Sequence, residues 1–375
     1  MAFGSHVDAQ RAHSPAAFDI QYAASVQEID PAAWDHLAAG RPFASHRWYW
    51  FGETVLSGDS PVYVILSYHG EPVARATFWL TSQEPLPVAS GLMRSVLYAA
   101  IRRWPLFLCR SPFASTTGLI LPDSPLRDPA LNTLTAITRD LSRQHRVSFT
   151  VFDYLDHEAK GLHWPNAFMR VDGLDPGTRL DITWADFESY VGDLRKSVRK
   201  DYRRHCNRAA DLGIEITYHD HVDDVEIALA LIQNVEQHHG SSPNPYARHM
   251  LENAGMVDGT WITATIEDRM VGCGLLLGDG STRFLALLGL DYEVRYAYFQ
   301  LVYAAIQRAI ELGTTVLRGG GGAYDLKSRL GFEPERDNHL MFSVTNPMLR
   351  WLARRLAAGA QSTSILTEED NREQG

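Results

Sequence analysis

Lysine is scarce in this chain of 375 residues: only Lys160, Lys196, Lys200 and Lys327 accompany 31 arginines. The two side chains are not interchangeable in a binding site, because arginine presents a planar fork of donors whereas lysine carries a compact point charge. Each of the four lysines is therefore a candidate functional group.

Cysteines and long apolar runs are also few. The three cysteines have no metal-type spacing and cannot form a disulfide framework, which favours a reduced, cytoplasmic protein. No apolar run reaches the roughly 18 residues that a membrane span requires, and residues 1–15 lack the apolar core of a secretory signal. Basic residues do not dominate either: the net charge is −10, so a polyanion would have to bind a local basic patch.

The length of the chain predicts two domains. Two successive alternations of strands and helices meet at DGLDPGT, residues 172–178. The second alternation includes three consecutive strands followed by a helix crossover, which indicates a mixed sheet with helices on both faces, the α/β class. We predict a flexible tail at 1–15, a first domain at 16–175, a second domain at 176–346, a C-terminal helix at 347–356 and a flexible tail at 357–375.

Four glycines interrupt the segment TTVLRGGGGAYDLKSRLGFEPE, residues 314–335, between a predicted strand and a predicted helix. A Walker phosphate loop would need a glycine immediately before Lys327, where Leu326 stands. A Rossmann loop would need a third glycine three positions after the second, where Tyr324 or Asp325 stands. Both phosphate loops are therefore excluded, which leaves a tight turn or a weak anion site at the start of the helix.

One long predicted helix, residues 185–213, concentrates basic side chains between residues 194 and 208 of an otherwise acidic protein. These side chains recur at four-residue spacing and form one continuous face, opposite an apolar stripe that includes Leu194 and Val198. Like charges at this spacing destabilise a helix by a few tenths of a kcal/mol per pair, so they need a partner. That partner is either nearby acidic side chains or the phosphates of a polyanion, and charge alone does not decide between them. The basic residues are Arg195, Lys196, Arg199, Lys200, Arg203, Arg204 and Arg208.

Two further candidates carry ionisable side chains at the ends of predicted elements. His238, at the end of a predicted helix, could act as a general base for an incoming amine, although the helix dipole also favours histidine there for structural reasons. Asp291, at the end of a predicted strand, could bind a substrate ammonium group or act as a base, or could simply end the strand. No set of ligands in the sequence predicts a metal site.

The order of motifs in the second half resembles the C-terminal half of the GNAT acyltransferase fold. The segment GLDYEVRYAYFQLVYAAIQRAIELG, a strand, and then GGGGAYDLKSRLGFEP resemble in particular the Fem-type aminoacyltransferases and the related biotin-synthesis-type acetyltransferase branch. RKSVRKDYRRHCNRAADLG resembles their basic helix, and PAAWDHLAAGRPFASHRWYW resembles the entry segment of the same superfamily. The resemblance spans residues 30–345 and implies two GNAT-like domains in tandem.

One departure from ordinary acetyltransferases of this fold concerns the donor. Those enzymes bind the pyrophosphate of coenzyme A with an R/Q-x-x-G-x-G/A turn before the long helix. Here the turn reads DYEVRYAY, residues 291–298, and its bulky side chains would obstruct close approach of the backbone to a pyrophosphate. Arg318 to Ala323 spells R-x-x-G-x-A but follows the next strand, one element too late. The resemblance therefore implies the Fem-type branch, whose donor is an aminoacyl-tRNA, with acyl-CoA as the alternative donor.

The resemblance also implies roles for individual residues. Fem-type enzymes carry a lysine that corresponds to Lys327, at the meeting point of donor and acceptor, where an ammonium group can hold a phosphate or stabilise an oxyanion. The basic helix and Arg318 would bind the phosphates of the donor. The residues implied for the cleft are Tyr298, Gly320, Gly321, Gly322 and Tyr324.

These features predict an acyltransferase that moves an aminoacyl group from aminoacyl-tRNA to a primary amine of a small acceptor, such as a cell-wall precursor or a natural-product intermediate. An aminoacyl ester is already activated, so we expect positioning, exclusion of water and oxyanion stabilisation to suffice, without a metal or a tightly bound cofactor. An acyl-CoA-dependent N-acyltransferase is the first alternative. A non-catalytic GNAT-like protein that binds RNA or a nucleotide is the second. Two fused domains make a monomer adequate.

Overall fold

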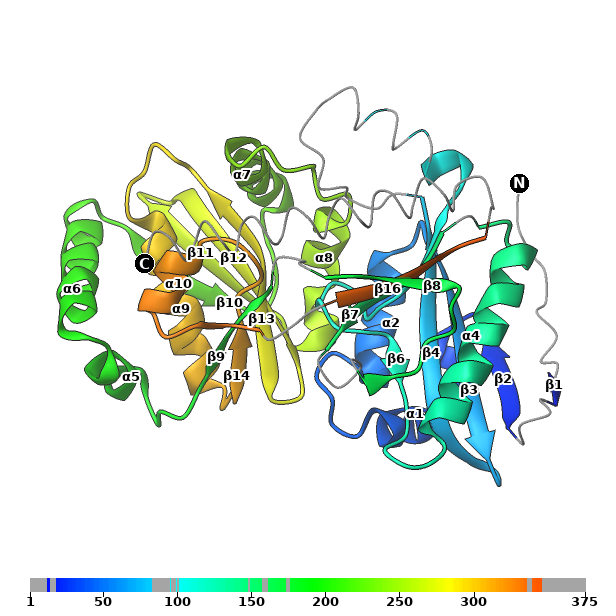
Figure 1. Ribbon diagram of the computed structural model, residues 1–375. Helices are drawn as coiled ribbons and strands as arrows, with labels where there is room; N and C mark the ends of the chain where they lie inside the picture. The colour runs from blue at the N-terminus through cyan, green and yellow to red at the C-terminus, as the bar shows by residue number, and fades with distance from the viewer. Residues whose placement is uncertain are drawn as a thin grey trace, which may run out of the picture.

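The computed structural model describes residues 12–13, 18–82, 95, 99, 101–147, 149–156, 161–172, 176–335 and 339–345. Two β-sheets lie side by side, each with helices packed against both faces (Figure 1). Each sheet combines antiparallel strands with one parallel pair. The predicted α/β class with mixed sheets is therefore confirmed.

The first sheet has the strand order β1-β2-β3-β4-β5-β7-β16-β8, with β6 paired to β4. Helices α1 and α2 pack on one face and α4 on the other. Helix α1 begins with Pro31 directly after Asp30, whose side chain accepts a hydrogen bond from the Ala33 N–H (2.9 Å). The elements are β1 (Ala12–His13), β2 (Asp19–Ala23), α1 (Pro31–Ala38), α2 (His46–Val55), β3 (Ser60–Tyr68), β4 (Glu71–Thr81), β5 (Leu106–Cys109), β6 (Leu119–Ile120), α4 (Arg127–Gln144), β7 (Phe149–Leu155) and β8 (Phe168–Val171).

The second sheet has the strand order β10-β11-β12-β13-β14-β9-β15. It contains the predicted meander of three consecutive strands, β11 to β13, and packs α7 on one face and α9 on the other. The elements are β9 (Thr178–Asp181), α5 (Phe187–Asp193), α6 (Lys196–Asp211), β10 (Glu215–His219), α7 (Val225–His238), α8 (Ala247–Asn253), β11 (Thr260–Ile266), β12 (Arg269–Asp279), β13 (Thr282–Leu290), α9 (Ala297–Glu311), β14 (Val316–Arg318), α10 (Tyr324–Arg329) and β15 (Glu333–Pro334). Strand β16 (His339–Val344) follows them in the chain but belongs to the first sheet.

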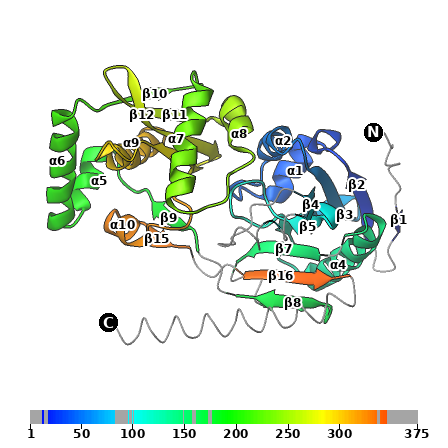
Figure 2. The same ribbon diagram turned by 90° about the horizontal axis from the view of Figure 1, so that it is seen from above.

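The chain crosses between the two sheets twice, once after β8 and once after β15. After the first crossing, β9 pairs with β14 and β15 of the second sheet. After the second crossing, β16 returns and pairs with β7 and β8 of the first sheet, as Figure 2 shows. The range predicted for the second domain, 176–346, includes β16 by sequence, whereas all the strand pairs of β16 lie in the first sheet. Its short apolar pattern predicts a strand but does not specify the partner.

The ends of the chain are described only in part. Within the predicted tail 1–15, Ala12 and His13 pair with β2 as strand β1. The predicted C-terminal helix 347–356 and tail 357–375 lie outside the described residues.

The single long helix that the sequence predicts before β10 is wrong, because two helices, α5 and α6, occupy this segment. Leu194 and Arg195 between them have extended backbone. Arg199 Nη1 donates to the carbonyl groups of Gly192 (2.7 Å) and Leu194 (2.6 Å), which satisfies acceptors left without helical partners at the break. Tyr190, Leu194 and Val198 are all buried at four-residue spacing, so the apolar periodicity runs through the break and conceals it.

One hydrophobic cluster joins both domains. Phe284 of β13 packs edge-on against Phe43 and Trp48 of the first domain, with ring centroids 5.3 and 5.9 Å apart. Asp279, at the end of β12, accepts a hydrogen bond from Ser45 Oγ (2.5 Å), immediately before α2. Burial raises the pKa of Asp279, while hydrogen bonds at the beginning of α2 act in the opposite direction. The two domains therefore share a core.

Candidate active site

A cavity of about 710 Å³ lies between the two domains. The first-domain wall comes from the loop between α1 and α2, the loop before β6, and the end of β7. The second-domain wall comes from β9, β14 and β15. The volume lies in the range of small-molecule sites, which commonly form between domains.

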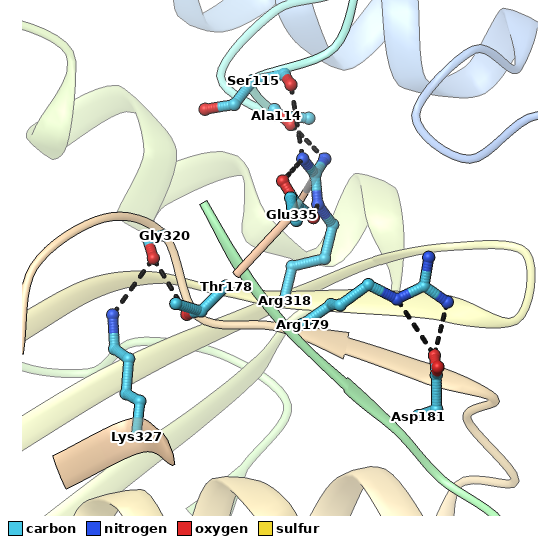
Figure 3. A network of polar contacts seen from close by, with 9 residues as sticks. All are labelled: Ala114, Ser115, Thr178, Arg179, Asp181, Arg318, Gly320, Lys327 and Glu335. Carbon is cyan, nitrogen blue, oxygen red and sulfur yellow. Dashed lines mark hydrogen bonds and ion pairs between the residues drawn. The ribbon is translucent and has the colours of Figure 1, made fainter. Parts of the chain in front are cut away.

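Strand register places charged side chains on the second-domain wall of this cavity. Four neighbouring strands align Phe284, Arg318, Arg179 and Glu333 in one row. Directly opposed residues of paired strands project to the same face of a sheet, so the charged members of the row face the first domain together. Arg179 forms an ion pair with Asp181, two residues along β9 (Figure 3). Strand β9, which follows the first crossing of the chain, therefore supplies charges to the cavity wall.

Arg318 joins the two domains through its guanidinium group. The group forms a bidentate ion pair with Glu335 and donates to the backbone carbonyls of Ala114 and Ser115 in the first domain (Figure 3). The Arg318 and Glu335 side chains are only 11% and 14% exposed. The sequence predicts that Arg318 binds phosphate, but in this conformation a phosphate could reach it only by displacing these partners.

A smaller pocket of about 170 Å³ adjoins the ion pair. It shares Ser115, Arg318 and Glu335 with the larger cavity. The pocket lies where β13 and β14 diverge, because their pairing ends at Phe284 and Arg318. The register of β13 against β12 shifts at Ala286, which is an extra residue that forms a β-bulge at the same place. The divergence opens space between the second sheet and residues 113–115 of the first domain, next to the ion pair.

Lys327 points back at the glycine run (Figure 3). Its Nζ donates to the carbonyl oxygens of Gly319 (2.5 Å), Gly320 (3.1 Å) and Gly321 (3.2 Å). Burial lowers the pKa of this amine to about 8. The Gly320 carbonyl also accepts a hydrogen bond from Thr178 Oγ1 (2.9 Å) of β9. In this conformation the three donors of the ammonium group bind the protein itself, so Lys327 shapes the glycine run.

The glycine run is a tight turn with the conformation that its composition predicts. Gly320 and Gly322 have φ angles of +65° and +78°, which other L residues rarely adopt. Tyr324, at the start of α10, donates its hydroxyl to the Pro176 carbonyl (2.7 Å) and so fixes the helix beside β9. Tyr298 packs within the apolar layer around α9, where burial raises its pKa. Among the predicted cleft residues, Gly320 alone lines the smaller pocket.

Helix α6 lies at the edge of the second domain, on the side away from the first domain (Figures 1 and 2). Residues of α6 alone line an open groove along it. Arg204 pairs with Asp201 (2.8 Å), and Arg199 caps α5. The basic side chains that are exposed and form no ion pair with any described residue are Arg195, Lys196, Lys200 and Arg203.

The basic helix is physically connected to the lysine-bearing helix. Asp201 of α6 pairs with Arg204 on the same helix and with Arg329 of α10, two residues after Lys327. Two acidic side chains, Asp201 and Asp211, therefore offset part of the clustered charge, and the exposed remainder has no ion-pair partner among the described residues.

Asp291 and His238 lie away from the cavity. Asp291 follows β13, about 23 Å along the strand from Phe284 at the usual rise per residue. Its carboxylate pairs with Arg269 (2.8 Å) and accepts a hydrogen bond from the Glu293 N–H (3.0 Å). The ring of His238, at the end of α7, stacks on Tyr292, the residue after Asp291, with centroids 4.0 Å apart. The structure does not place either predicted catalytic residue beside the cavity.

Sequence reasoning missed the other charged residues of the cavity besides Arg318: Arg41, Asp156, Arg179, Asp181, Glu333 and Glu335. The available signal was the pair of charges at Arg179 and Asp181 in the short strand RLD, because alternate residues of a strand point to the same face of the sheet. The described residues contain no group of three or more side chains able to hold a metal ion. Nor does that part of the chain contain a helix long and apolar enough to cross a membrane.

A family model, FemAB-like, described as peptidoglycan biosynthesis/recognition, matches residues 25–373. No curated protein matches the chain.

Solved structures resemble the chain over most of its length. FemX is 11% identical over 85% of this chain and 97% of its own, with a TM-score of 0.59. A tandem GNAT protein from the clavulanic acid biosynthesis pathway is 12% identical over 88% of this chain and 99% of its own, with a TM-score of 0.55. The C-terminal domain of a putative lysylphosphatidylglycerol synthetase from Agrobacterium fabrum is 11% identical over 91% and 97%, with a TM-score of 0.52. These likenesses confirm the predicted fold of two GNAT-like domains in tandem.

Proposed function

The chain belongs to the FemAB-like family and is an acyltransferase; on that premise we propose that it transfers an aminoacyl group from aminoacyl-tRNA to a primary amine. One observation carries the proposal: a cavity of about 710 Å³ and a pocket of about 170 Å³ meet at a single ion pair, Arg318–Glu335. A transfer reaction needs two substrates whose reacting atoms approach at one point. The family description, peptidoglycan biosynthesis/recognition, supports a cell-wall precursor as acceptor, and a natural-product intermediate is the other acceptor class.

We assign the acceptor to the larger cavity and the reacting ester to the smaller pocket. The acceptor nitrogen attacks the ester carbonyl carbon, the new C–N bond forms, and the ester C–O bond breaks. The amine proton leaves with the departing hydroxyl group. The ester is already activated, so the protein would contribute positioning and exclusion of water. Lys327 would support this step by holding the glycine run, or by turning its ammonium toward the oxyanion.

The exposed basic side chains of α6 support a polyanionic donor. Arg195, Lys196, Lys200 and Arg203 have no ion-pair partner among the described residues. Phosphates of an RNA backbone would neutralise them and release counterions. The ion pair between Arg329 and Asp201 connects this face to α10, which carries Lys327. We therefore propose that α6 binds the donor while α10 approaches its reactive end.

The turn between β13 and α9 counts against the alternative donor, acyl-CoA. A pyrophosphate there would need free backbone N–H groups. The N–H of Glu293 instead donates to the Asp291 carboxylate (3.0 Å), and that of Val294 donates to the Asp291 carbonyl (3.0 Å). The carboxylates of Asp291 and Glu293 would also repel the phosphates. These contacts favour the tRNA donor.

The test follows radiolabel from two donors into an amine acceptor. Purified protein is incubated with a cell-wall precursor fraction and either labelled aminoacyl-tRNA or labelled acetyl-CoA. We expect transfer from tRNA alone, and its loss in Lys196→Ala/Lys200→Ala. Transfer from acetyl-CoA would overturn the donor assignment. If Lys327→Ala, folded by circular dichroism, kept RNA binding and full biological function, the protein would be a binding protein without catalytic activity.

A further inference from the structure

Two charged side chains of the larger cavity are available to a ligand. Arg41, in the loop after α1, and Glu333, in β15, both line the cavity and are exposed, and neither pairs with a described residue. The other charged side chains there are engaged. Arg179 and Arg318 are each held by a carboxylate, and Asp156 also has an interaction partner. Unpaired charges in a concave site are the groups that orient a ligand.

Arg41 supplies a positive charge at its end of the cavity, where the Asp279 carboxylate accepts a hydrogen bond from the Ala44 N–H. Behind its wall, Arg75 is 1% exposed and donates to the carbonyl of Ala44 (2.7 Å), a residue that lines the cavity. The guanidinium lies 3.6 Å from the ring centroid of Trp34 and forms no ion pair with a described carboxylate. Burial lowers the pKa of Arg75 to about 10, so it stays charged at neutral pH. Its charge acts through a low-dielectric interior and adds to that of Arg41.

The end of the cavity at Glu333 is negative. The residue directly opposite Glu333 on β9 is Arg179, but the Arg179 guanidinium is bound by Asp181. The three side chains together carry one net negative charge. Glu333 therefore remains available to an ammonium group of a ligand.

Strand order gives the separation of the two ends. Asp279, next to β13, accepts a hydrogen bond from the Ala44 N–H (3.0 Å), so the loop that carries Arg41 lies beside β13. Glu333 is on β15, three strands away in the order β13-β14-β9-β15. At the usual spacing of neighbouring strands the two ends are about 14 Å apart. An extended peptide of about four residues has this length.

We propose that the cavity binds an extended zwitterion, with its acidic group at Arg41 and its ammonium group at Glu333. This rests on the proposed function, in which the cavity receives the acceptor, and names the acceptor's chemical class. Glu333 lies two residues before Glu335, so an amine at this end is close to the boundary with the smaller pocket.

The test measures binding of four probes by calorimetry, without any donor. The probes are tetra-alanine, its N-acetyl derivative, its C-terminal amide, and di-alanine as a length control. We expect tetra-alanine to bind about tenfold or more tighter than each of the others. Arg41→Ala should weaken tetra-alanine and its N-acetyl form but leave the amide unchanged. Glu333→Gln should weaken tetra-alanine and the amide but leave the N-acetyl form unchanged.

The pattern distinguishes a dipolar site from general loss of structure. Both substituted residues are exposed, and unchanged thermal unfolding of the variants would show that they fold. Equal binding of all four probes, or equal weakening of every probe in each variant, would overturn the proposal. The expected binding pattern without transfer from aminoacyl-tRNA would leave the acceptor site standing and refute the proposed donor. Transfer from tRNA without probe selectivity would refute the proposed acceptor site and leave the proposed donor standing.

Discussion

A single lysine holds three carbonyl groups of the glycine run, and its burial has a consequence for pH dependence. Because burial lowers the pKa of Lys327 to about 8, the ammonium loses its proton as pH rises through that value. If the charged form supports catalysis, kcat should fall above pH 8. Lys327→Arg, which stays charged, should retain activity and lose this decline. A rise in kcat through pH 8, with an inactive Lys327→Arg, would identify the lysine as a base instead.

The same shift affects stability with a defined sign. Between pH 8 and 10.5 the unfolded chain keeps a proton on Lys327 that the folded chain has released. The unfolded state binds more protons, so the contribution of this group to the free energy of unfolding increases with pH in that window.

The ion pair between Arg318 and Glu335 is a second feature that a single substitution can test. Both side chains are largely buried, and Arg318 also holds two carbonyls of the first domain. Glu335→Ala would leave a buried guanidinium without its carboxylate, so the free energy of unfolding should fall by about 3 kcal/mol. Denaturant unfolding measures this. Asp140→Ala, which breaks the exposed pair with Arg143, is the control and should change stability by less than about 1 kcal/mol.

Among the helices and strands, α6 carries more positive side chains than there are carboxylates paired with them. Lys200→Ala/Arg203→Ala should weaken RNA binding and reduce the slope of log K against log salt by roughly two, because two phosphate contacts are lost. Arg102→Ala/Arg103→Ala removes the same charge from exposed positions in the first domain and is the matched control. Equal losses in the two variants would mean that RNA binding follows net charge rather than this helix.

The long, regular elements and the meander could be predicted from the sequence, whereas the pairing of strands far apart in the chain could not. The meander and the helices around it follow from apolar periodicity and short turns, and the glycine run follows from its need for positive φ. Leu194 and Arg195 break a helix inside an unbroken apolar pattern, and the break becomes visible only in the hydrogen bonds that Arg199 donates to the Gly192 and Leu194 carbonyls. The cavity is assembled from segments far apart in the chain, which explains why Glu333 and Arg41 gave no local signal.

For the whole molecule, two features predict one cooperative unfolding unit: β16 returns to the first sheet after the second sheet is complete, and the two domains share a hydrophobic core. A chain that ends at residue 338 lacks β16, so β7 and β8 lose the strand between them. We expect this truncation to abolish the unfolding transition of both domains, measured by circular dichroism. A chain that ends at 356 keeps β16 and should retain the transition. Independent melting of the two halves in the full chain would contradict this prediction.

The position of β16 also has a consequence for biosynthesis. The ribosome releases the chain from N-terminus to C-terminus, so β7 and β8 are made long before the strand that separates them. During most of translation the first sheet is an incomplete template with open edges, and such edges invite pairing with other chains. A message cut short just before residue 339 would yield a product that cannot complete the first sheet, although every strand of the second sheet has been made. Quality control in the cell could therefore recognise nearly every incomplete copy as misfolded.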